Sequence, residues 1–310
     1  MKNHKALAAL LLLFVVAVWG ATFPLVKRAL QDCSPLFFNQ VRMLFAFAIL
    51  AVVHLREWRQ MNRRSLITGA IAGFFLAAGY EFQTAGLALT TPSKSAFLTG
   101  MIVVIVPVLS MLPGLRVRGV PLRAGRTMFA SLIAFAGIVL LTVPAHTAAR
   151  ELFSAINRGD VLTLFCALAF AMHLLTLSKA SHGISIAQLA TLQIGFCALF
   201  MSITTPMVER ISVHWTATLL IVLAICAVFA TAAAFSIQSW AQRHLPSSQT
   251  ALLLSLEPVF AWMVSLLFFG ERLGARSMTG AAMIFAAILL TEIGASPSSP
   301  DPNAAPIPES

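Results

Sequence analysis

Apolar runs of about 20 residues, the length of a membrane-spanning helix, recur along the chain with short polar connections between them. The strands of a membrane β-barrel would instead alternate apolar and polar residues in segments of about 10 residues. The pattern therefore predicts an all-α integral membrane protein with ten transmembrane helices. We expect these helices at residues 6–26, 35–55, 66–89, 95–115, 124–144, 158–179, 184–207, 215–240, 246–269 and 276–294.

The composition supports a membrane environment. Hydrophobic residues make up 59% of the 310 residues and charged residues 10%, and the mean hydropathy is +0.88. A soluble domain has about 45–50% apolar and about 25% charged residues, so this chain is too apolar for one soluble core. The net charge of +10 could indicate nucleic-acid binding, but the Lys and Arg residues lie in short connections between apolar runs. We therefore expect contact with the lipid bilayer and no nucleic-acid partner.

The basic residues of the connections predict how the helices are oriented. The N-terminal segment resembles a signal peptide, but its apolar run extends through Trp19 to about Val26, so we interpret it as an uncleaved first span. With the N-terminus inside, 12 Lys and Arg residues fall on the cytoplasmic side and 8 on the other side. The bias comes from the first half, and early helices usually dominate the orientation. We predict a multi-pass protein of the plasma (inner) membrane with both termini cytoplasmic.

The two halves of the chain resemble each other weakly at one nearly constant offset. The segment "GIVLLT" (137–142) resembles "AAILLT" (286–291) at a shift of 149 residues. A shift of 151 residues places Trp19 on Phe170, Arg28 on Lys179, Arg42 on Gln193 and Pro107 on Pro258.

An odd number of spans in each copy makes the second copy enter the membrane from the opposite side. Such inverted repeats are typical of secondary transporters, whose substrate sites lie at the repeat interface near the bilayer midplane. We predict two inverted repeats of five helices, at residues 6–144 and 157–294. A Pro- and Ser-rich tail at 295–310 is expected to be disordered.

Four stretches carry a resemblance to a known family. They are "WGATFPLVK" (19–27), "SPLFFNQVR" (34–42), "FQTAGLALTTPSKSAFLTGMIVVIVPVLS" (82–110) and "LLSLEPVFAWMVSLLFFGERL" (253–273). They resemble the EamA family of the drug/metabolite transporter superfamily, in two repeats over about 6–294. The resemblance implies ten spans and transport of small metabolites or drugs, often outward. In one departure, the Gly-Glu-Arg-Leu ending at 270–273 has no counterpart after the fourth span.

Two prolines predict interruptions in the fourth and ninth spans. Proline lacks an N–H and crowds the carbonyl four residues earlier, so Pro107 is expected to free the carbonyl of Val103, and Pro258 that of Leu254. Irregular backbone inside a membrane is tolerated where protein or a water-filled cavity covers it. We therefore expect both helices to line a central cavity, with simple packing kinks as the alternative.

Charged residues within apolar spans are candidates for function. Glu257 precedes Pro258 and could bind a cationic group, carry a proton, or serve as a structural carboxyl group. Arg42 is the expected countercharge of Glu81, either as a buried pair that joins two helices or as a site for an anion or a zwitterion. At the end of the ninth span, Glu271 and Arg272 are expected to neutralise each other.

Further polar and aromatic residues are candidates for the same site. We expect Gln83, Gln193 and Gln238 to bind solute or to join helices by hydrogen bonds. The expected apolar walls of the cavity are Trp19, Tyr80 and Phe82, with core or lipid contact as the alternative. His173 could carry a proton or be a histidine bonded within the bundle.

These features predict a secondary transporter of small organic solutes, operating as an exporter. The chain contains no HExxH, GxSxG or Walker motif, so we expect neither an enzyme nor an ATP-driven pump, and no cofactor and no metal. An integral-membrane enzyme and a non-transporting receptor or assembly subunit are the alternatives. Protons are a candidate coupling ion because Glu81 and Glu257 can be protonated, and sodium coupling and uniport stay open. The sequence does not predict the oligomeric state.

Overall fold

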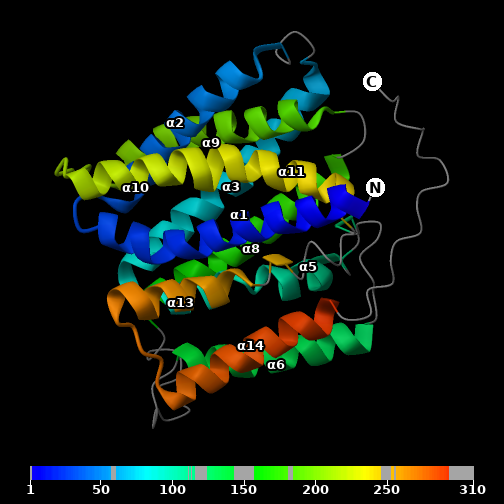
Figure 1. Ribbon diagram of the computed structural model, residues 1–310, viewed down its shortest axis with the longest axis vertical. Coiled ribbons are helices and arrows are strands. Elements are labelled where there is room, and N and C mark those ends of the chain that lie inside the picture. Colours follow the sequence, from blue (N-terminus) through cyan, green and yellow to red (C-terminus); the bar gives the residue numbers. More distant parts are fainter. Residues whose placement is uncertain are drawn as a thin grey trace.

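A computed structural model describes residues 2–56, 61–110, 112, 114–115, 124–142, 157–180, 184–245, 253–254 and 256–292. Every regular element within these ranges is helical, which confirms the predicted all-α class (Figure 1). The predicted tail at 295–310 and residues 246–252 of the expected ninth span lie outside the described residues.

The helices follow one another in the order that hydropathy predicts. They are α1 (Lys2–Ala29), α2 (Pro35–Val53), α3 (Arg63–Leu89), α4 (Pro92–Thr99), α5 (Ile102–Ser110), α6 (Ala124–Thr142), α8 (Arg158–Ala180), α9 (Ile186–Val208), α10 (Ala217–Ala227), the π-helix η3 (Val228–Ala233), α11 (Ala234–His244), α13 (Glu257–Phe269) and α14 (Ala275–Glu292).

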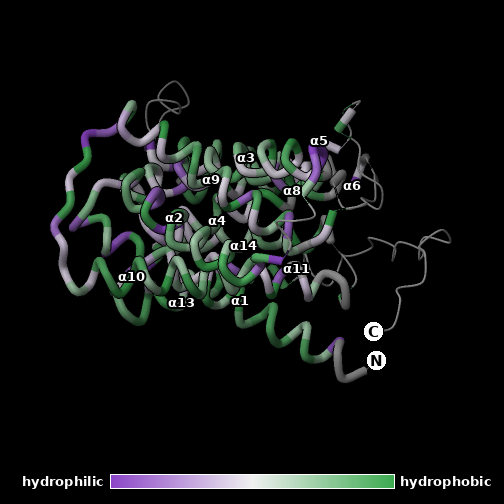
Figure 2. Tube along the Cα trace, turned by 90° about the horizontal axis from the view of Figure 1, so that it is seen from above, coloured by the Kyte–Doolittle hydropathy of each residue, from purple (hydrophilic) through white to green (hydrophobic). Residues whose placement is uncertain are grey.

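The length and surface of the helices show a multi-pass membrane protein. Three apolar helices are shorter than the 18 residues taken as the least length of a span, namely Phe129–Leu141, Glu257–Phe269 and Ala275–Leu290. Figure 2 shows hydrophobic residues along most of the helices. Outward side chains such as Phe135 and Phe268 are 64% and 77% exposed, as expected of groups that face lipid. Seven helical stretches of the described residues are long and apolar enough to cross a bilayer: Lys5–Ala29, Pro35–Val53, Arg63–Leu89, Pro92–Ser110, Arg158–Leu177, Ala187–Val208 and Ala217–Gln238. The total of ten spans stays a prediction.

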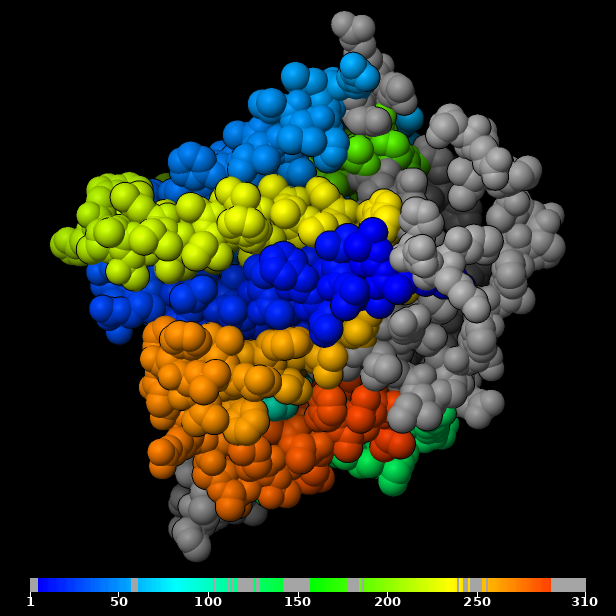
Figure 3. Space-filling model, viewed as in Figure 1, coloured from blue at the N-terminus to red at the C-terminus, as the bar shows by residue number. Residues whose placement is uncertain are grey.

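The helices lie side by side, and most close pairs join the first half of the chain to the second. On the face shown in Figure 3, α1 lies between α10 and α11 on one side and α13 on the other. Behind it, α3 packs against α8 and α9, and α2 packs against α9 and η3. The helices α4 and α13 form another pair, as do α6 and α14. The core is therefore built between the halves.

Small residues allow the closest of these approaches. A Cβ atom on Gly137 in α6 would lie 2.8 Å from the carbonyl oxygen of Gly280 in α14, and one on Gly159 in α8 would lie 2.6 Å from the carbonyl oxygen of Gly86 in α3. Membrane helices commonly associate through such small residues because lipid tails provide no hydrophobic drive for association.

Two helices are interrupted near the expected proline kinks. The fourth span breaks at Gly100–Met101, between α4 and α5, about two turns before Pro107, which lies within α5. Helix α13 begins at Glu257, and Pro258 lies in its first turn, where a missing N–H breaks no helical hydrogen bond. The two interruptions meet in space, because a Cβ atom on Gly100 would lie 3.1 Å from Cγ of Pro258.

Candidate functional site

Arg42 lies in the middle of α2 and is buried, with 3% of its surface exposed. Its Nε donates a 2.9 Å hydrogen bond to the hydroxyl of Thr231. Its Nη2 donates to the Tyr80 hydroxyl at 3.4 Å and to the Ala230 carbonyl at 3.5 Å. The guanidinium carbon lies 4.6 Å from the centre of the Tyr80 ring, within range of a cation–π interaction. The predicted pairing with Glu81 is wrong, and no carboxylate among the described residues is within ion-pair distance of Arg42.

Two of the three hydrogen-bond partners of Arg42, Ala230 and Thr231, belong to the π-helix η3. The indole Nε1 of Trp19 in α1 donates a 2.8 Å hydrogen bond to the same Ala230 carbonyl, and the Trp19 ring lies 5.8 Å from the ring of Phe235. Thr231 donates in turn to the carbonyl of Cys226 at 2.8 Å. Short π-helical turns within α-helices are frequent at functional sites. Two side chains, from α1 and α2, therefore converge on an irregular turn of the helix formed by α10, η3 and α11, and Tyr80 of α3 joins them through Arg42.

Tyr80 is fixed from both its ring and its backbone. The Nδ2 of Asn39 donates a 2.8 Å hydrogen bond to the Tyr80 carbonyl, and the Oδ1 of Asn39 accepts one from Thr84 at 3.1 Å. The Tyr80 ring packs edge-on against Phe170 of α8, with 5.2 Å between ring centres. This buried network holds the Tyr80 hydroxyl beside Arg42.

Glu257 is the first residue of α13. Tyr80 lies within electrostatic range of both Arg42 and Glu257. The Glu257 carboxylate has no hydrogen-bond or ion-pair partner among the residues that the structure describes. Its backbone lies against α1, because a Cβ atom on Gly20 would be 2.8 Å from the Glu257 carbonyl oxygen. A basic and an acidic group thus lie within electrostatic range of one tyrosine, and the two form no ion pair with each other.

The other acidic candidate, Glu81, lies away from this cluster. Its carboxylate accepts a hydrogen bond from the hydroxyl of Thr204 in α9, and the side chain is half-buried. The predicted wall residue Phe82 is 37% exposed and packs against Phe165 of α8, which is 50% exposed. Such exposure fits a lipid-facing side chain better than a wall of an internal site.

The predicted amide residues are distributed over other helix pairs. The Nε2 of Gln83 donates to the Thr99 hydroxyl at 3.4 Å, next to the break in the fourth span. Gln193 bonds His173 through its Oε1 and the ring Nε2 at 2.7 Å, and both side chains are buried. Gln238 is partly buried in α11. The Gln193–His173 bond therefore joins α8 to α9, as the interhelical interpretation of these residues expects.

The structure brings together three residues that the sequence pointed to, Trp19, Arg42 and Tyr80, and a fourth, Glu257, lies within electrostatic range of Tyr80. Two of their neighbours were missed. Asn39 lies three residues before Arg42 in the same apolar run, so its polarity and helical spacing could have identified it. Thr231 had no comparable signal, because its role depends on a π-helical turn.

Glu271 also has different partners from the predicted ones. It accepts hydrogen bonds from the backbone N and the hydroxyl of Ser93, at 3.3 Å and 2.9 Å, and from the hydroxyl of Ser265. The neighbouring Arg272 is exposed. The expected mutual neutralisation of Glu271 and Arg272 is therefore wrong.

The fold is that of a multi-pass helical membrane protein with a buried polar cluster. The model of the EamA-like transporter family matches residues 6–143 and again 157–293. The chain belongs to this family.

Curated relatives and a solved structure agree with this assignment. An "Uncharacterized transporter" of Archaeoglobus fulgidus is 33% identical over 91% of this chain and 84% of its own length. The "Uncharacterized transporter YvbV" of Bacillus subtilis (strain 168) is 25% identical over 92% of each chain. A solved crystal structure aligns over 91% of this chain and 95% of its own with a TM-score of 0.61 and 17% identity, which shows a shared fold.

Proposed function

We propose that the chain is a secondary active transporter that exports small organic solutes by alternating access between its two halves. The observation that carries this proposal is the central cluster. Among the described residues, the buried Arg42 guanidinium has no carboxylate partner and the Glu257 carboxylate has no hydrogen-bond partner, and Tyr80 lies within electrostatic range of both. Uncompensated charges inside a membrane are costly, and they usually mark substrate or ion pathways.

The packing of the helices supports the proposed inverted repeats at 6–144 and 157–294. Equivalent spans of the two repeats pack against each other in three pairs, α2 with α9, α4 with α13, and α6 with α14. Two further pairs occur twice in equivalent form. The pair α3 and α8 corresponds to α11 and α1, and the pair α1 and α13 corresponds to α8 and α4. A pseudo-two-fold axis between the repeats would generate this pattern.

In this proposal Arg42 binds an acidic group of the solute, and Glu257 binds a basic group or carries a proton. Tyr80 lies within electrostatic range of both charges and supplies a hydroxyl, while Trp19 and Phe235 form an aromatic wall beside the π-helical turn. Gln83, which donates to Thr99 beside the break in the fourth span, is a further polar group for the solute in this proposal. Arg42 and Tyr80 lie on helices of the first half and Glu257 lies on a helix of the second half. A rocking motion of the halves would therefore change the spacing between these groups.

The orientation and the coupling ion complete the proposal. Both termini lie in the cytoplasm, and the protein is in the plasma (inner) membrane, as the charges of the first connections favour. Protons couple transport through Glu257. Glu81 is less suited to this role, because Thr204 already donates a hydrogen bond to it.

Efflux from cells that express the wild type, Glu257→Gln or Glu81→Gln tests the proposal. Cells are loaded with a panel of labelled amino acids, organic acids, amines and sugars, and protein amounts are matched. We expect the wild type to release one class of solute, Glu257→Gln to release none of it, and Glu81→Gln to resemble the wild type. Equal release by the wild type and by cells without the protein, across the panel, would contradict the proposal.

A further inference from the structure

One end of the bundle is closed by contacts between the two halves. This distal end lies opposite the N-terminus in Figure 1. It consists of the connections at 30–34, 90–91, 209–216 and 270–274, together with the helix ends that they join. Three carboxylates of the second half, Glu209, Glu271 and Asp160, each hold a segment of the first half here.

Glu209 follows α9 and caps the first turn of α2. Its Oε2 accepts hydrogen bonds from the backbone N–H groups of Leu36 at 2.9 Å and Phe37 at 3.2 Å. The first N–H groups of a helix have no partner within the helix, and the helix dipole favours a negative charge beside them. The carboxylate therefore fixes one half of the chain to the other.

Glu271 makes the equivalent contact to α4. Its Oε2 accepts from the N–H and the hydroxyl of Ser93, in the first turn of that helix. Among the residues that the structure describes, its Oε1 is buried without a hydrogen-bond partner, and Lys27 lies within electrostatic range of Glu271. The Nζ of Lys27 donates to the carbonyls of Leu87 and Ala88, both at 2.8 Å, at the end of α3. Through Glu271, the Gly-Glu-Arg-Leu ending at 270–273 therefore anchors the first turn of the fourth span.

Asp160 at the start of α8 is fully buried and adds a third contact. It accepts a hydrogen bond from the Thr90 hydroxyl, and its Oδ2 lies 3.9 Å from the Nζ of Lys94. Asn157 donates to the carbonyl of Leu89 at 2.9 Å. Both contacts hold the turn between α3 and α4 against the first turn of α8.

In a further contact at this end, the carboxylate belongs to the first half and the donor to the second. Asp32 of the first half accepts a 2.6 Å hydrogen bond from the hydroxyl of Thr216, the N-cap residue of α10. The backbone of residues 32–34 pairs with that of residues 212–214 in an antiparallel bridge between Cys33 and Val213.

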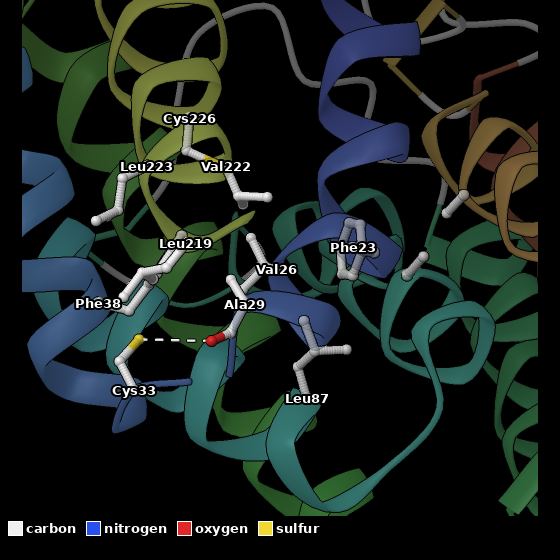
Figure 4. Close-up of a cluster of buried hydrophobic side chains, with 12 residues drawn as sticks. Phe23, Val26, Ala29, Cys33, Phe38, Leu87, Leu219, Val222, Leu223 and Cys226 are labelled. Atoms are coloured by element: carbon white, nitrogen blue, oxygen red, sulfur yellow. Dashed lines mark hydrogen bonds between the residues drawn. The ribbon is translucent and has the colours of Figure 1, made fainter. Parts of the chain in front are cut away.

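An apolar layer lies directly beneath these polar contacts. It contains the side chains of Phe23, Val26, Ala29, Cys33, Phe38, Leu87, Ala96, Leu219, Val222, Leu223, Cys226 and Ala261, which we call the distal seal (Figure 4). Its members come from six helices, the connection at 30–34 and both halves, and each is at most 6% exposed. Along α1 the order is Trp19 of the central cluster, then Phe23 and Val26 of the seal, then Lys27. The seal therefore separates the central cluster from the distal end.

We propose that Glu209, Glu271 and Asp160 are the latches of a gate that closes the distal end, with the distal seal as its plug. The inference rests on the proposed alternating access, in which the two halves must separate at one end. Each latch joins the halves through hydrogen bonds that water can replace when the gate opens. In the open gate the seal residues are reached by solvent, and a path leads to Arg42 and Glu257.

The native cysteines report this opening without any solute. Cys33 and Cys226 belong to the distal seal, whereas Cys166 and Cys197 are buried elsewhere in the bundle. The purified protein in lipid nanodiscs is treated with a charged thiol reagent, and mass spectrometry follows each cysteine separately. Gate opening exposes the first pair alone, while loss of the fold exposes all four.

The variant Glu271→Gln removes the charge of one latch far from Cys33, whose nearby carboxylates are Asp32 and Glu209. We expect Cys33 and Cys226 to react at least tenfold faster than in the wild type, with Cys166 and Cys197 unchanged. Arg272→Gln is the matched control, because it changes the adjacent exposed charge and leaves the Ser93 contact intact. Wild-type reactivity of both seal cysteines in Glu271→Gln would overturn the gate and leave Glu271 as a helix cap.

A second variant covers the case in which Glu271→Gln loses its fold and all four cysteines react. Ser93→Ala removes one hydrogen bond to Glu271 and keeps the backbone N–H. It is expected to accelerate the same two seal cysteines by a smaller factor, and unchanged reactivity would overturn the proposal.

A disulfide lock provides the reverse test. Cys33 and Val213 form a pair flanked by the hydrogen bonds from Ser34 N to Ser212 O and from His214 N to Asp32 O, and such pairs have Cα atoms about 4.5 Å apart. This spacing suits a disulfide. In Glu271→Gln with Val213→Cys, oxidation is expected to return Cys226 to its slow wild-type reaction, and reduction to restore the fast one. Fast reaction of Cys226 in the locked protein would contradict the gate, and absence of solute efflux in the wild type would instead contradict the proposed function.

Discussion

Gly20 lies where α1 and α13 approach most closely, and one added methyl group there tests the packing beside Glu257. An ideal Cβ atom at position 20 would lie 2.6 Å from Cβ of Phe260 and 2.8 Å from both the backbone N of Ala261 and the carbonyl oxygen of Glu257. Ordinary contacts of a Cβ atom begin at 3.4 Å, so the helices must separate by about 0.8 Å. Two of the three neighbours are backbone atoms, and a change of rotamer cannot relieve the overlap.

The expected magnitude follows from comparing Gly20→Ala with Gly125→Ala. Overpacking of this kind costs about 1–3 kcal/mol. Alanine stabilises a helix relative to glycine by up to about 1 kcal/mol, and this gain applies to both variants. At Gly125 in α6, a Cβ atom would have no neighbour within 4 Å. The difference in unfolding free energy between the two variants therefore isolates the overpacking cost, and Gly20→Ala should be less stable by about 1–3 kcal/mol.

Unfolding in mixed micelles, followed by tryptophan fluorescence as the denaturing detergent is increased, measures this difference. Equal stability of Gly20→Ala and Gly125→Ala would refute the close approach of α1 and α13. A larger residue, Gly20→Leu, is expected to enlarge the loss, which would exclude a compensating effect of helix propensity.

Three other predictions follow from the described contacts. Arg42→Met is expected to melt near the wild-type temperature or above it but to lose efflux. The variant loses hydrogen bonds worth about 1.5–3 kcal/mol, and the removal of a buried charge without a carboxylate partner offsets this loss. A large drop in melting temperature would show that Arg42 is mainly a structural link. Glu81→Gln is expected to keep both stability and efflux, because an amide oxygen also accepts the hydrogen bond from Thr204; loss of efflux in a stably folded variant would place Glu81 in the transport path. Burial, with the carboxylates of Asp32 and Glu209, raises the pKa of the Cys33 thiol from 9.0 to about 12. Below pH 9 the neutral Cys33 thiol therefore favours the closed distal end. This stabilisation is lost as the pH rises towards about 12, where the thiol ionises. Because thiolates are the reacting species, alkylation of Cys33 should keep accelerating from pH 8 to pH 10.5, and a plateau near pH 9 would show a solvated thiol.

The sequence predicted the helices well because hydropathy and capping determine them locally. The second span was expected at 35–55, and α2 covers Pro35–Val53, with proline at its first turn. The seventh was expected at 184–207, and α9 covers Ile186–Val208, because the hydroxyl of Ser185 caps the helix at the N–H of Gln188. Such signals lie within a few residues of the boundary that they set.

The partners of Arg42 could not be predicted in the same way. Successive residues of an α-helix point about 100° apart, so neighbours in the sequence face different helices. Tyr80 faces α2 and η3, and Glu81 therefore faces α9 and Thr204. Charge alone suggested the pair Arg42 and Glu81, but the rotation of α3 about its axis decides which side chain meets Arg42.

The distal latches were missed because their partners are backbone groups of the other half of the chain. Glu209 and Glu271 lie in short connections, and nothing in their local spacing identifies the first turns of α2 and α4 as the groups that they cap. A contact between residues separated by more than 170 positions is fixed by the packing of whole helices.

Solute flux into or out of proteoliposomes with purified protein tests the central claim most directly. The solute is the one that the cell panel identifies, and the wild type is compared with Glu257→Gln at equal protein content. The account predicts saturable flux with the wild type and only the leak of protein-free vesicles with Glu257→Gln. Leak-level flux with the wild type, or equal flux with both proteins, would contradict a transport site built around Arg42, Tyr80 and Glu257.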